Sequence, residues 1–316
     1  MEKRKLGKSA LMVAPLAFGG NVFGWTVDEA TAFKLLDAFT GAGFNLIDTA
    51  DVYSKWVSGN KGGESETIIG KWLKQSGKRE QVIVATKVGG EMGPQQKGTS
   101  KTYITRAVED SLRRLQTDYI DLYQTHFDDI NTPVEETLAT YATLIKEGKV
   151  RVIGTSNMSP ERLQLSLHNS EDYGYPRYET LQPEYNLYDR RKFETTYAPI
   201  CREHGLGVLP YYALASGFLS GKYRSKADVD KSPRGSKALG YLNERGMRIL
   251  AALDAVAARY NTTPASVSIA WLAQRPNIAA PIASATSLEQ LDALMKAATL
   301  ALDQDAINQL DVASKY

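Results

Sequence analysis

The sequence predicts an α/β fold, a (β/α)8 barrel of the TIM type, and three observations support this prediction. Short β-branched or apolar runs alternate with longer amphipathic segments along the chain. The strand-like runs number eight, which is the number of parallel strands that closes such a barrel. A doubly wound dinucleotide-binding sheet would carry a Gly-x-Gly-x-x-Gly turn after its first strand, and the stretch FGGNVFG there does not match it.

The strands and helices expected from this pattern follow one another in strict alternation. The expected strands are 15–18, 44–48, 82–87, 119–124, 150–156, 180–185, 207–212 and 278–283. Helices are expected over 28–43, 65–77, 104–116 and 134–148, among others, because apolar residues recur there at spacings of three and four. Glycines that suit helix ends stand at Gly43, Gly77, Gly148 and Gly205.

Further segments are additions to the bare barrel. Residues 3–13 read as a short hairpin around Gly7 that could plug the bottom of the barrel. The eighth helix is expected over 287–299, and one more helix follows over 303–314. The stretch 220–242 reads as a long loop rather than a domain linker, because strands lie on both sides of it. We therefore expect a single barrel domain over residues 1–316.

Composition narrows the class of protein. The 38 Lys and Arg residues nearly balance 36 Asp and Glu, so no basic field favours nucleic acid. The longest apolar runs fall short of 18 residues, and the charged N-terminus lacks the apolar core of a signal peptide. A single cysteine, Cys201, excludes an intrachain disulfide. We expect a cytoplasmic protein, monomeric or homo-oligomeric, with neither a nucleic-acid nor a membrane partner.

Polar side chains stand at the ends of three neighbouring strands, where barrel enzymes carry their active sites. Asp48 ends the second strand and Tyr53 follows it, Lys87 ends the third, and His126 follows the fourth. Each residue alone has a structural explanation, such as a cap, a solvated lysine or a packed tyrosine. Their joint occurrence at consecutive strand ends favours a catalytic site.

Carbonyl reduction accounts for this set, because it needs a hydride to carbon and a proton to oxygen. A free tyrosine has a pKa of about 10, and a nearby ammonium favours its ionised form. Lys87 can therefore lower the pKa of Tyr53, Asp48 can hold Lys87 through an ion pair, and His126 can orient the substrate oxygen. No spacing of His, Cys, Asp and Glu suggests a metal site.

The chain as a whole resembles the aldo-keto reductase family. The motifs that show the resemblance are GFNLIDTADVY (43–53), VIVATKVG (82–89), DSLRRLQTDYIDLYQTHFDD (110–129), GKVRVIGTSN (148–157), LQPEYNLYDR (181–190) and LASGFLSGKYR (214–224). The resemblance implies a barrel that binds a nicotinamide cofactor without a Rossmann domain. It also implies that Asp48, Tyr53, Lys87 and His126 form a catalytic tetrad with Tyr53 as the general acid.

The resemblance further implies a set of residues that bind the cofactor, NADPH with NADH possible. Ser156, Asn157 and Gln182 would bind the nicotinamide carboxamide, and the nicotinamide ring would stack on Tyr211. Residues Leu214, Ser216, Gly217 and Lys222 would cover the pyrophosphate, Gly20 and Asn21 would approach the nicotinamide, and Ser284, Thr286 and Gln290 follow the eighth strand.

Some positions depart from the family pattern. Ser284, Gln290 and Leu294 replace residues that are common around the adenosine part of the cofactor. The residues left for a 2′-phosphate are the basic Lys222, Arg224, Arg234 and Lys237 and the neutral Thr286 and Ser287. Tyr212 and Ala213 stand where the family commonly has Ser and Pro, which predicts a reshaped pyrophosphate loop or altered packing.

The substrate is expected to be a small-molecule carbonyl compound held by aromatic side chains. Trp25, Trp56 and Phe127 lie in loops after the strands and could wall a pocket, although at least one could pack under its own loop. Two other readings remain open. The resembled family includes cofactor-binding subunits of potassium channels, which implies a regulatory module, and a barrel enzyme of another class, such as an isomerase, is a weaker alternative.

Overall fold

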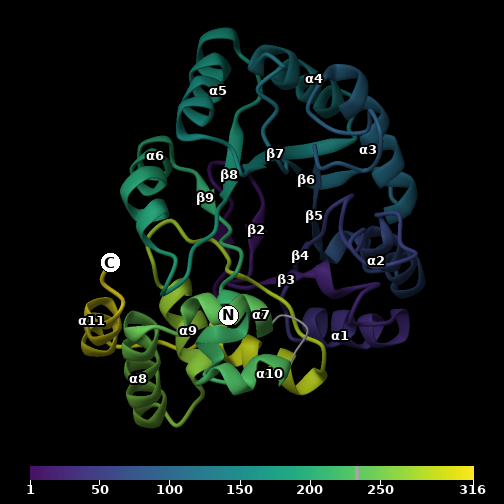
Figure 1. Cartoon of the computed structure of the whole chain (residues 1–316). Coiled ribbons are helices and arrows are strands. Elements are labelled where there is room, and N and C mark those ends of the chain that lie inside the picture. The colour runs from purple at the N-terminus through teal and green to yellow at the C-terminus, as the bar shows by residue number, and fades with distance from the viewer. Residues whose placement is uncertain (232–234) are drawn as a thin grey trace.

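The computed structural model describes residues 1–231 and 235–316, and in these ranges eight parallel strands form one curled sheet (Figure 1). The strand order is β10-β3-β4-β5-β6-β7-β8-β9. The strands are β3 (Ala17–Gly19), β4 (Leu46–Asp48), β5 (Ile83–Val88), β6 (Ile120–Thr125), β7 (Val150–Ser156), β8 (Tyr178–Gln182), β9 (Gly207–Val208) and β10 (Ile282–Ala283). A parallel bridge between Val208 and Ile278 closes the ring, which confirms the (β/α)8 barrel.

Helices surround this sheet on its outer side (Figure 1). They are α1 (Glu29–Gly41), α2 (Glu64–Ser76), α3 (Lys101–Leu115), α4 (Val134–Lys146), α5 (Pro160–Tyr173), α6 (Ala198–His204), α7 (Gly235–Ala238), α8 (Glu244–Arg259), α9 (Pro264–Ala273), α10 (Leu288–Ala298) and α11 (Gln304–Ala313). Polar side chains such as Asp28, Ser100 and Ser159 cap the first turns of helices by accepting hydrogen bonds from backbone N–H groups. The four glycines predicted at helix ends all have positive φ angles.

Several strands are shorter than the sequence pattern predicts, because prolines stand inside the apolar runs. Pro15 precedes β3, Pro183 follows β8, Pro210 follows β9, and Pro281 precedes β10. Proline has no N–H to donate to a neighbouring strand, so regular pairing stops or starts beside it. The apolar runs are correct in position, but their flanks are irregular strand extensions.

The N-terminal hairpin of β1 (Arg4–Lys5) and β2 (Met12–Val13) closes one end of the barrel. Leu6 and Val13 are fully buried in a cluster with inward-facing side chains of the strands, including Leu46 and Leu122. The hairpin therefore acts as the expected plug, and the opposite end of the barrel is left for the site.

Helices α2 and α3 approach each other closely at one glycine. A Cβ atom placed on Gly70 would lie 2.1 Å from the carbonyl oxygen of Arg114, a distance that real side chains do not reach. A Cβ on Gly41 in α1 would meet nothing within 4 Å. The absence of a side chain at Gly70 is thus required for the contact between the two helices.

The stretch 220–242 is not the single loop that was expected. It contains the short helical turns η5 (Lys226–Lys231), α7 and η6 (Leu239–Tyr241), and residues 232–234 lie outside the described ranges. Over residues 1–231 and 235–316, no helix is long and apolar enough to cross a membrane.

Candidate active site

The barrel brings the four predicted catalytic side chains together at the C-terminal ends of β4, β5 and β6. We call Asp48, Tyr53, Lys87 and His126 the tetrad. The Lys87 Nζ atom lies 2.8 Å from Asp48 Oδ2 and 2.8 Å from the Tyr53 hydroxyl. The Tyr53 hydroxyl donates to Asp48 Oδ2 at 3.2 Å, and the Tyr53 and His126 rings are 6.0 Å apart. Three parallel strands that end at one edge account for this proximity.

Lys87 is the centre of the tetrad and is fully buried. Its ammonium group donates to Asp48 Oδ2, to the Tyr53 hydroxyl and to the main-chain oxygen of Thr49, the last at 2.7 Å. An ammonium has three protons, so every donor of Lys87 is used. Thr49 was missed by the sequence reading, because a main-chain carbonyl leaves no mark in the residue type.

Burial sets the direction of the pKa shifts in the tetrad. It raises the pKa of Tyr53 well above its usual value, and the Asp48 carboxylate raises it further. This direction is opposite to the lowering expected from Lys87, because desolvation of the phenolate outweighs the ammonium. Burial also lowers the pKa of Lys87, although Asp48 opposes it. The pKa of His126 lies well below its usual value because of burial and the charge of Lys87.

These directions define the protonation states at neutral pH. The Tyr53 phenol is protonated, and the His126 imidazole is neutral, with one nitrogen a donor and the other an acceptor. The Nδ1 atom of His126 is buried without a hydrogen-bond partner among the described residues. The tetrad therefore combines a proton-bearing phenol with a neutral imidazole and a buried ion pair.

Gln182 on β8 reaches the tetrad from across the barrel. Its Nε2 atom donates to Asp48 Oδ1 at 2.9 Å and lies 3.4 Å from Oε1 of Gln124. Asp48 thus accepts from Lys87 on one oxygen and from Gln182 on the other. The predicted contact of Gln182 with a carboxamide stays a prediction, and its observed partner is Asp48.

The other residues predicted to bind the carboxamide and the nicotinamide ring form a hydrogen-bonded chain beside the tetrad. The Ser156 hydroxyl donates to the main-chain oxygen of Gln182 at 2.8 Å. Asn157 donates to the main-chain oxygen of His126 at 2.9 Å and accepts from the Tyr211 hydroxyl at 3.1 Å. Amide, hydroxyl and aromatic groups are therefore gathered at the ends of β7, β8 and β9.

The loop after β9 contains several residues in the left-handed backbone region. The φ angles are 55° at Tyr212, 46° at Ala215, 56° at Ser216 and 94° at Gly217. Turns of this kind direct backbone N–H groups to one side and form concavities that suit anions. A Cβ on Gly217 would lie 3.1 Å from the Lys222 ammonium, so this cation packs against the same turn.

The residues predicted after β10 lie near the first strand. The Ser284 hydroxyl donates to Asn21 at 2.6 Å, and a Cβ on Gly19, the neighbour of Gly20, would lie 2.6 Å from that hydroxyl oxygen. The Gln290 side chain accepts from the N–H and hydroxyl of Thr286 at 3.0 and 3.1 Å, so its oxygen is held locally.

The basic residues considered for a 2′-phosphate differ in whether they form an ion pair with a carboxylate. Arg224 forms two hydrogen bonds with Asp254, at 2.8 and 2.7 Å, so its charge is compensated. Lys237 is exposed and donates to the Tyr212 hydroxyl at 3.4 Å. Leu294, at the position considered for adenine, is buried in the core. Arg234 lies outside the described residues.

Aromatic side chains lie next to the rings of Tyr53 and His126. The Trp25 and Trp56 rings are 5.7 Å apart, and Trp56 lies 6.2 Å from the Tyr53 ring. Phe127 stacks on His126 with 4.5 Å between ring centres. Trp56 and Phe127 are about half exposed, at 52% and 46%. Trp56 and Phe127, two of the predicted substrate residues, thus present exposed apolar surface next to the tetrad.

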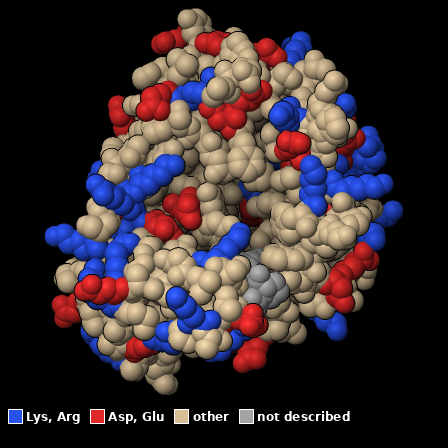
Figure 2. Space-filling view, viewed as in Figure 1, with Lys and Arg blue, Asp and Glu red and all other residues tan. Residues whose placement is uncertain are grey.

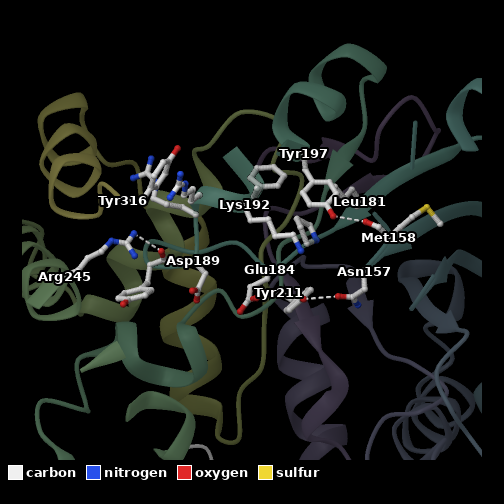
Figure 3. Close-up of a pocket in the computed structure, with 15 residues that line it drawn as sticks. Asn157, Met158, Leu181, Glu184, Asp189, Lys192, Tyr197, Tyr211, Arg245 and Tyr316 are labelled. Carbon is white, nitrogen blue, oxygen red and sulfur yellow. Dashed lines mark hydrogen bonds between the residues drawn. The ribbon is translucent and has the colours of Figure 1, made fainter. Parts of the chain in front are cut away.

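A pocket of about 370 Å³ has Asn157 and Tyr211 in its lining (Figure 3). Its lining includes Glu184, Asp189, Lys192, Tyr197, Arg245 and Tyr316, and none of the tetrad. Figure 2 shows the hollow on this face with acidic and basic side chains at its margin. Asn157 and Tyr211 therefore line a pocket that also contains acidic and basic side chains.

Metal-binding clusters are not part of this site. Within residues 1–231 and 235–316, no three His, Cys, Asp or Glu side chains are placed to hold a metal ion. Cys201 is buried in α6, and burial raises the pKa of its thiol to about 12, so it is not a nucleophile at neutral pH. Fold and site together define a barrel enzyme whose polar groups lie at the C-terminal strand ends.

Comparison with known proteins identifies the family. The model of the aldo/keto reductase family matches residues 15–315. The chain is 35% identical to the uncharacterized oxidoreductase YrpG of Bacillus subtilis over 98% of this chain and 95% of the relative. It is 31% identical to protein tas of Escherichia coli over 98% and 97% of the two chains. The chain belongs to the aldo/keto reductase family and is an oxidoreductase.

A third relative is named for a different role. The probable voltage-gated potassium channel subunit beta of Oryza sativa is 35% identical over 94% of this chain and 91% of the relative. The family resemblance predicted from the motifs is thus confirmed, and so is the presence of channel subunits among the relatives.

Proposed function

We propose that this protein is an NADPH-dependent reductase that converts aldehyde or ketone carbonyls to alcohols, with Tyr53 as the general acid. The observation that supports this proposal is the position of the Tyr53 hydroxyl, 2.8 Å from Lys87 Nζ and beside the aromatic rings at the barrel mouth. A proton donor, a buried cation and an apolar wall lie at one point. Acyl transfer and metal-assisted chemistry would need other groups.

The residues at the ends of β7 to β10 fit a nicotinamide cofactor. Asn157, Ser156 and Gln182 offer amide and hydroxyl groups, and Tyr211 offers an aromatic face. The left-handed turn after β9 and Lys222 suit a pyrophosphate. When bound, the cofactor supplies the hydride that reduces the carbonyl carbon. Lys222 and Lys237 form no ion pair with a carboxylate among the described residues. Their ammonium groups can therefore bind a 2′-phosphate, which would favour NADPH over NADH.

The tetrad then supplies the proton. The raised pKa of Tyr53 keeps the phenol protonated until the carbonyl oxygen gains negative charge. Tyr53 donates its proton to that oxygen, and the phenolate that remains is stabilised by the Lys87 ammonium at 2.8 Å. Asp48 holds Lys87 in place, and the neutral His126 donates a hydrogen bond to the carbonyl oxygen and fixes its direction.

The test is the Tyr53→Phe variant, with Tyr123→Phe as a matched control on the outer side of the barrel wall. Tyr53→Phe should lower kcat for reduction of an aromatic aldehyde by about 10²–10⁴-fold, the range for loss of a general acid. NADPH binding, followed by quenching of tryptophan fluorescence, should be unchanged in both variants. Wild-type turnover by Tyr53→Phe would contradict the assignment, and tighter binding of NADH than NADPH would contradict the cofactor preference.

A second candidate function is a cofactor-binding regulatory subunit that senses the redox state of NADP(H). The observation that favours it is the 35% identity to the rice channel subunit. This function predicts very slow turnover and retention of a membrane-protein partner when the oxidised or reduced cofactor is bound. Rapid turnover of small carbonyl compounds, with no partner recovered from solubilised membranes, would reject it.

A further inference from the structure

Asp51, two residues before Tyr53, is a buried acid without a side-chain hydrogen-bond partner. It is 2% exposed, and in the described part of the chain neither carboxylate oxygen accepts a hydrogen bond from a side chain, while the adjacent backbone N–H of Val52 is the hydrogen-bond donor that acts on it. Buried carboxyl groups in proteins are normally paired or hydrogen-bonded. An unpartnered acid beside a catalytic site is therefore a candidate for a functional group rather than a structural one.

The groups around Asp51 come from helices α2, α3 and α4 and from strands β5 and β6. Glu66 of α2 is fully buried, accepts from Thr86 at 2.5 Å and pairs with Arg114 of α3 at 2.6 Å. Arg114, the cation that most opposes the raised pKa of Asp51, is thus already engaged by another carboxylate. The remaining groups that interact with Asp51 are the Lys87 ammonium and the hydroxyls of Tyr103, Tyr123 and Tyr141.

Two contacts connect this cluster to the tetrad. The backbone N–H of Asp51 donates to the main-chain oxygen of Lys87 at 3.4 Å, so the two residues are tied through their backbones. The Tyr123 hydroxyl, which also faces Asp51, is fully buried and has no partner within the described residues. The backbones of Asp51 and Lys87 are therefore adjacent, and the charge of each side chain acts on the other.

Desolvation decides the charge of this acid. Burial, and after it the charge of Glu66, raise the pKa of Asp51 to about 8, although Arg114, the backbone N–H of Val52 and Lys87 oppose the shift. The carboxyl is consequently neutral at neutral pH and becomes a carboxylate in mildly alkaline solution.

We propose that Asp51 is a positioning residue for the tetrad, a buried acid next to the Lys87 backbone whose negative charge keeps Lys87 charged. The proposal rests on the proposed reductase function and extends it to a residue that does not touch substrate or cofactor. With this charge present, Lys87 stays protonated next to the Tyr53 phenolate over a wider range of pH.

The reasoning follows from the competing effects on Lys87. Burial lowers the pKa of Lys87, whereas Asp48 raises it most and the charges of Asp51 and Glu66 add to that effect. As pH rises past 8, Asp51 loses its proton. The resulting negative charge favours the ammonium form of Lys87 over the neutral amine. Without that charge, Lys87 would lose its proton at a lower pH, and the phenolate formed from Tyr53 would lose its stabilising partner.

The experiment compares wild type with Asp51→Asn, which keeps the shape and removes the ionisation. At pH 6.5 the two should reduce an aromatic aldehyde with similar kcat/KM, because Asp51 is uncharged in both. The alkaline limb of the kcat/KM profile should fall at a lower pH in Asp51→Asn by about half a pH unit or more, the effect of one nearby charge. Tyr123→Phe changes the same cluster without changing a charge, so its profile should match wild type.

A second readout does not depend on activity. Infrared difference spectra of the protein without cofactor, recorded between pH 6.5 and pH 9.5, should show loss of a protonated carboxyl band in wild type but not in Asp51→Asn. If the asparagine variant does not fold, Asp51→Leu takes its place. The inference is overturned if both proteins share the same alkaline limb, if Asp51→Asn shows the same loss of a carboxyl band as wild type, or if Asp51→Asn loses activity equally at every pH. Failure of the proposed reductase function would instead appear as normal turnover by Tyr53→Phe.

Discussion

Relative to wild type, Asp51→Asn should become more stable as pH rises. Removal of an acid that is ion-paired in the folded state would have the opposite effect. The pKa of this carboxyl is about 8 in the folded chain against an ordinary value of 3.8. At pH values between these two, the unfolded chain has released the proton and the folded chain has not. The wild type therefore loses stability with rising pH, and Asp51→Asn, which has no proton to release, does not.

The magnitude follows from linkage. One proton retained by the folded state and released by the unfolded state costs about 1.4 kcal/mol of unfolding free energy per pH unit. Over the two units between pH 5 and pH 7, the gain of Asp51→Asn relative to wild type is about 2.7 kcal/mol. The gain should level off above about pH 8, where the folded carboxyl also ionises.

The assay is reversible urea unfolding of both proteins at half-unit steps from pH 5 to pH 9. The difference between the two curves isolates Asp51, because the other titrating groups are common to both proteins. Tyr123→Phe is again the control, and its difference from wild type should not depend on pH. A difference for Asp51→Asn that stays flat between pH 5 and pH 7, or that falls, would refute a buried neutral carboxyl.

Three further predictions concern the tetrad and the helix contact. Lys87→Met should impair reduction about as strongly as Tyr53→Phe, because the phenolate loses its cation, and a pH–rate profile like that of wild type would count against this. The neutral His126 predicts no step in kcat between pH 5.5 and pH 7.5, and a step that vanishes in His126→Gln would contradict the lowered pKa. Gly70→Ala should destabilise by about 3 kcal/mol or more in urea because its Cβ meets the Arg114 carbonyl, whereas Gly41→Ala should change stability by less than about 1 kcal/mol.

The fold and the position of the tetrad could be predicted because both depend on local patterns. Apolar runs of strand length, separated by helical periodicity, fix eight strands, and parallel strands that end together bring Asp48, Lys87 and His126 to one edge. The errors at strand boundaries also have a local cause, since the prolines at 210 and 281 were visible in the sequence.

The electrostatics could not be predicted, because they depend on burial and on partners distant in sequence. Lys87 alone suggested a lowered pKa for Tyr53, but desolvation reverses the direction. Gln182 reaches Asp48 across 134 positions of sequence, a contact that only the closed ring creates. The sequence assigned no role to Asp51, since nothing in its neighbours showed that Glu66 would engage Arg114 and leave Asp51 without a side-chain partner.

The pairing of β10 with β3 has a consequence for the order in which the chain acquires its structure. The tetrad is complete within the first 126 residues, yet the free edge of β3 is covered only when Ile282 pairs with Ala17. At a synthesis rate of about 5–20 residues per second, the N-terminal half waits roughly ten seconds or more for that partner. During this interval β3 presents an open strand edge of the kind that invites aggregation. That edge is covered only by Ile282 and Ala283, which are synthesised after the other seven strands of the sheet.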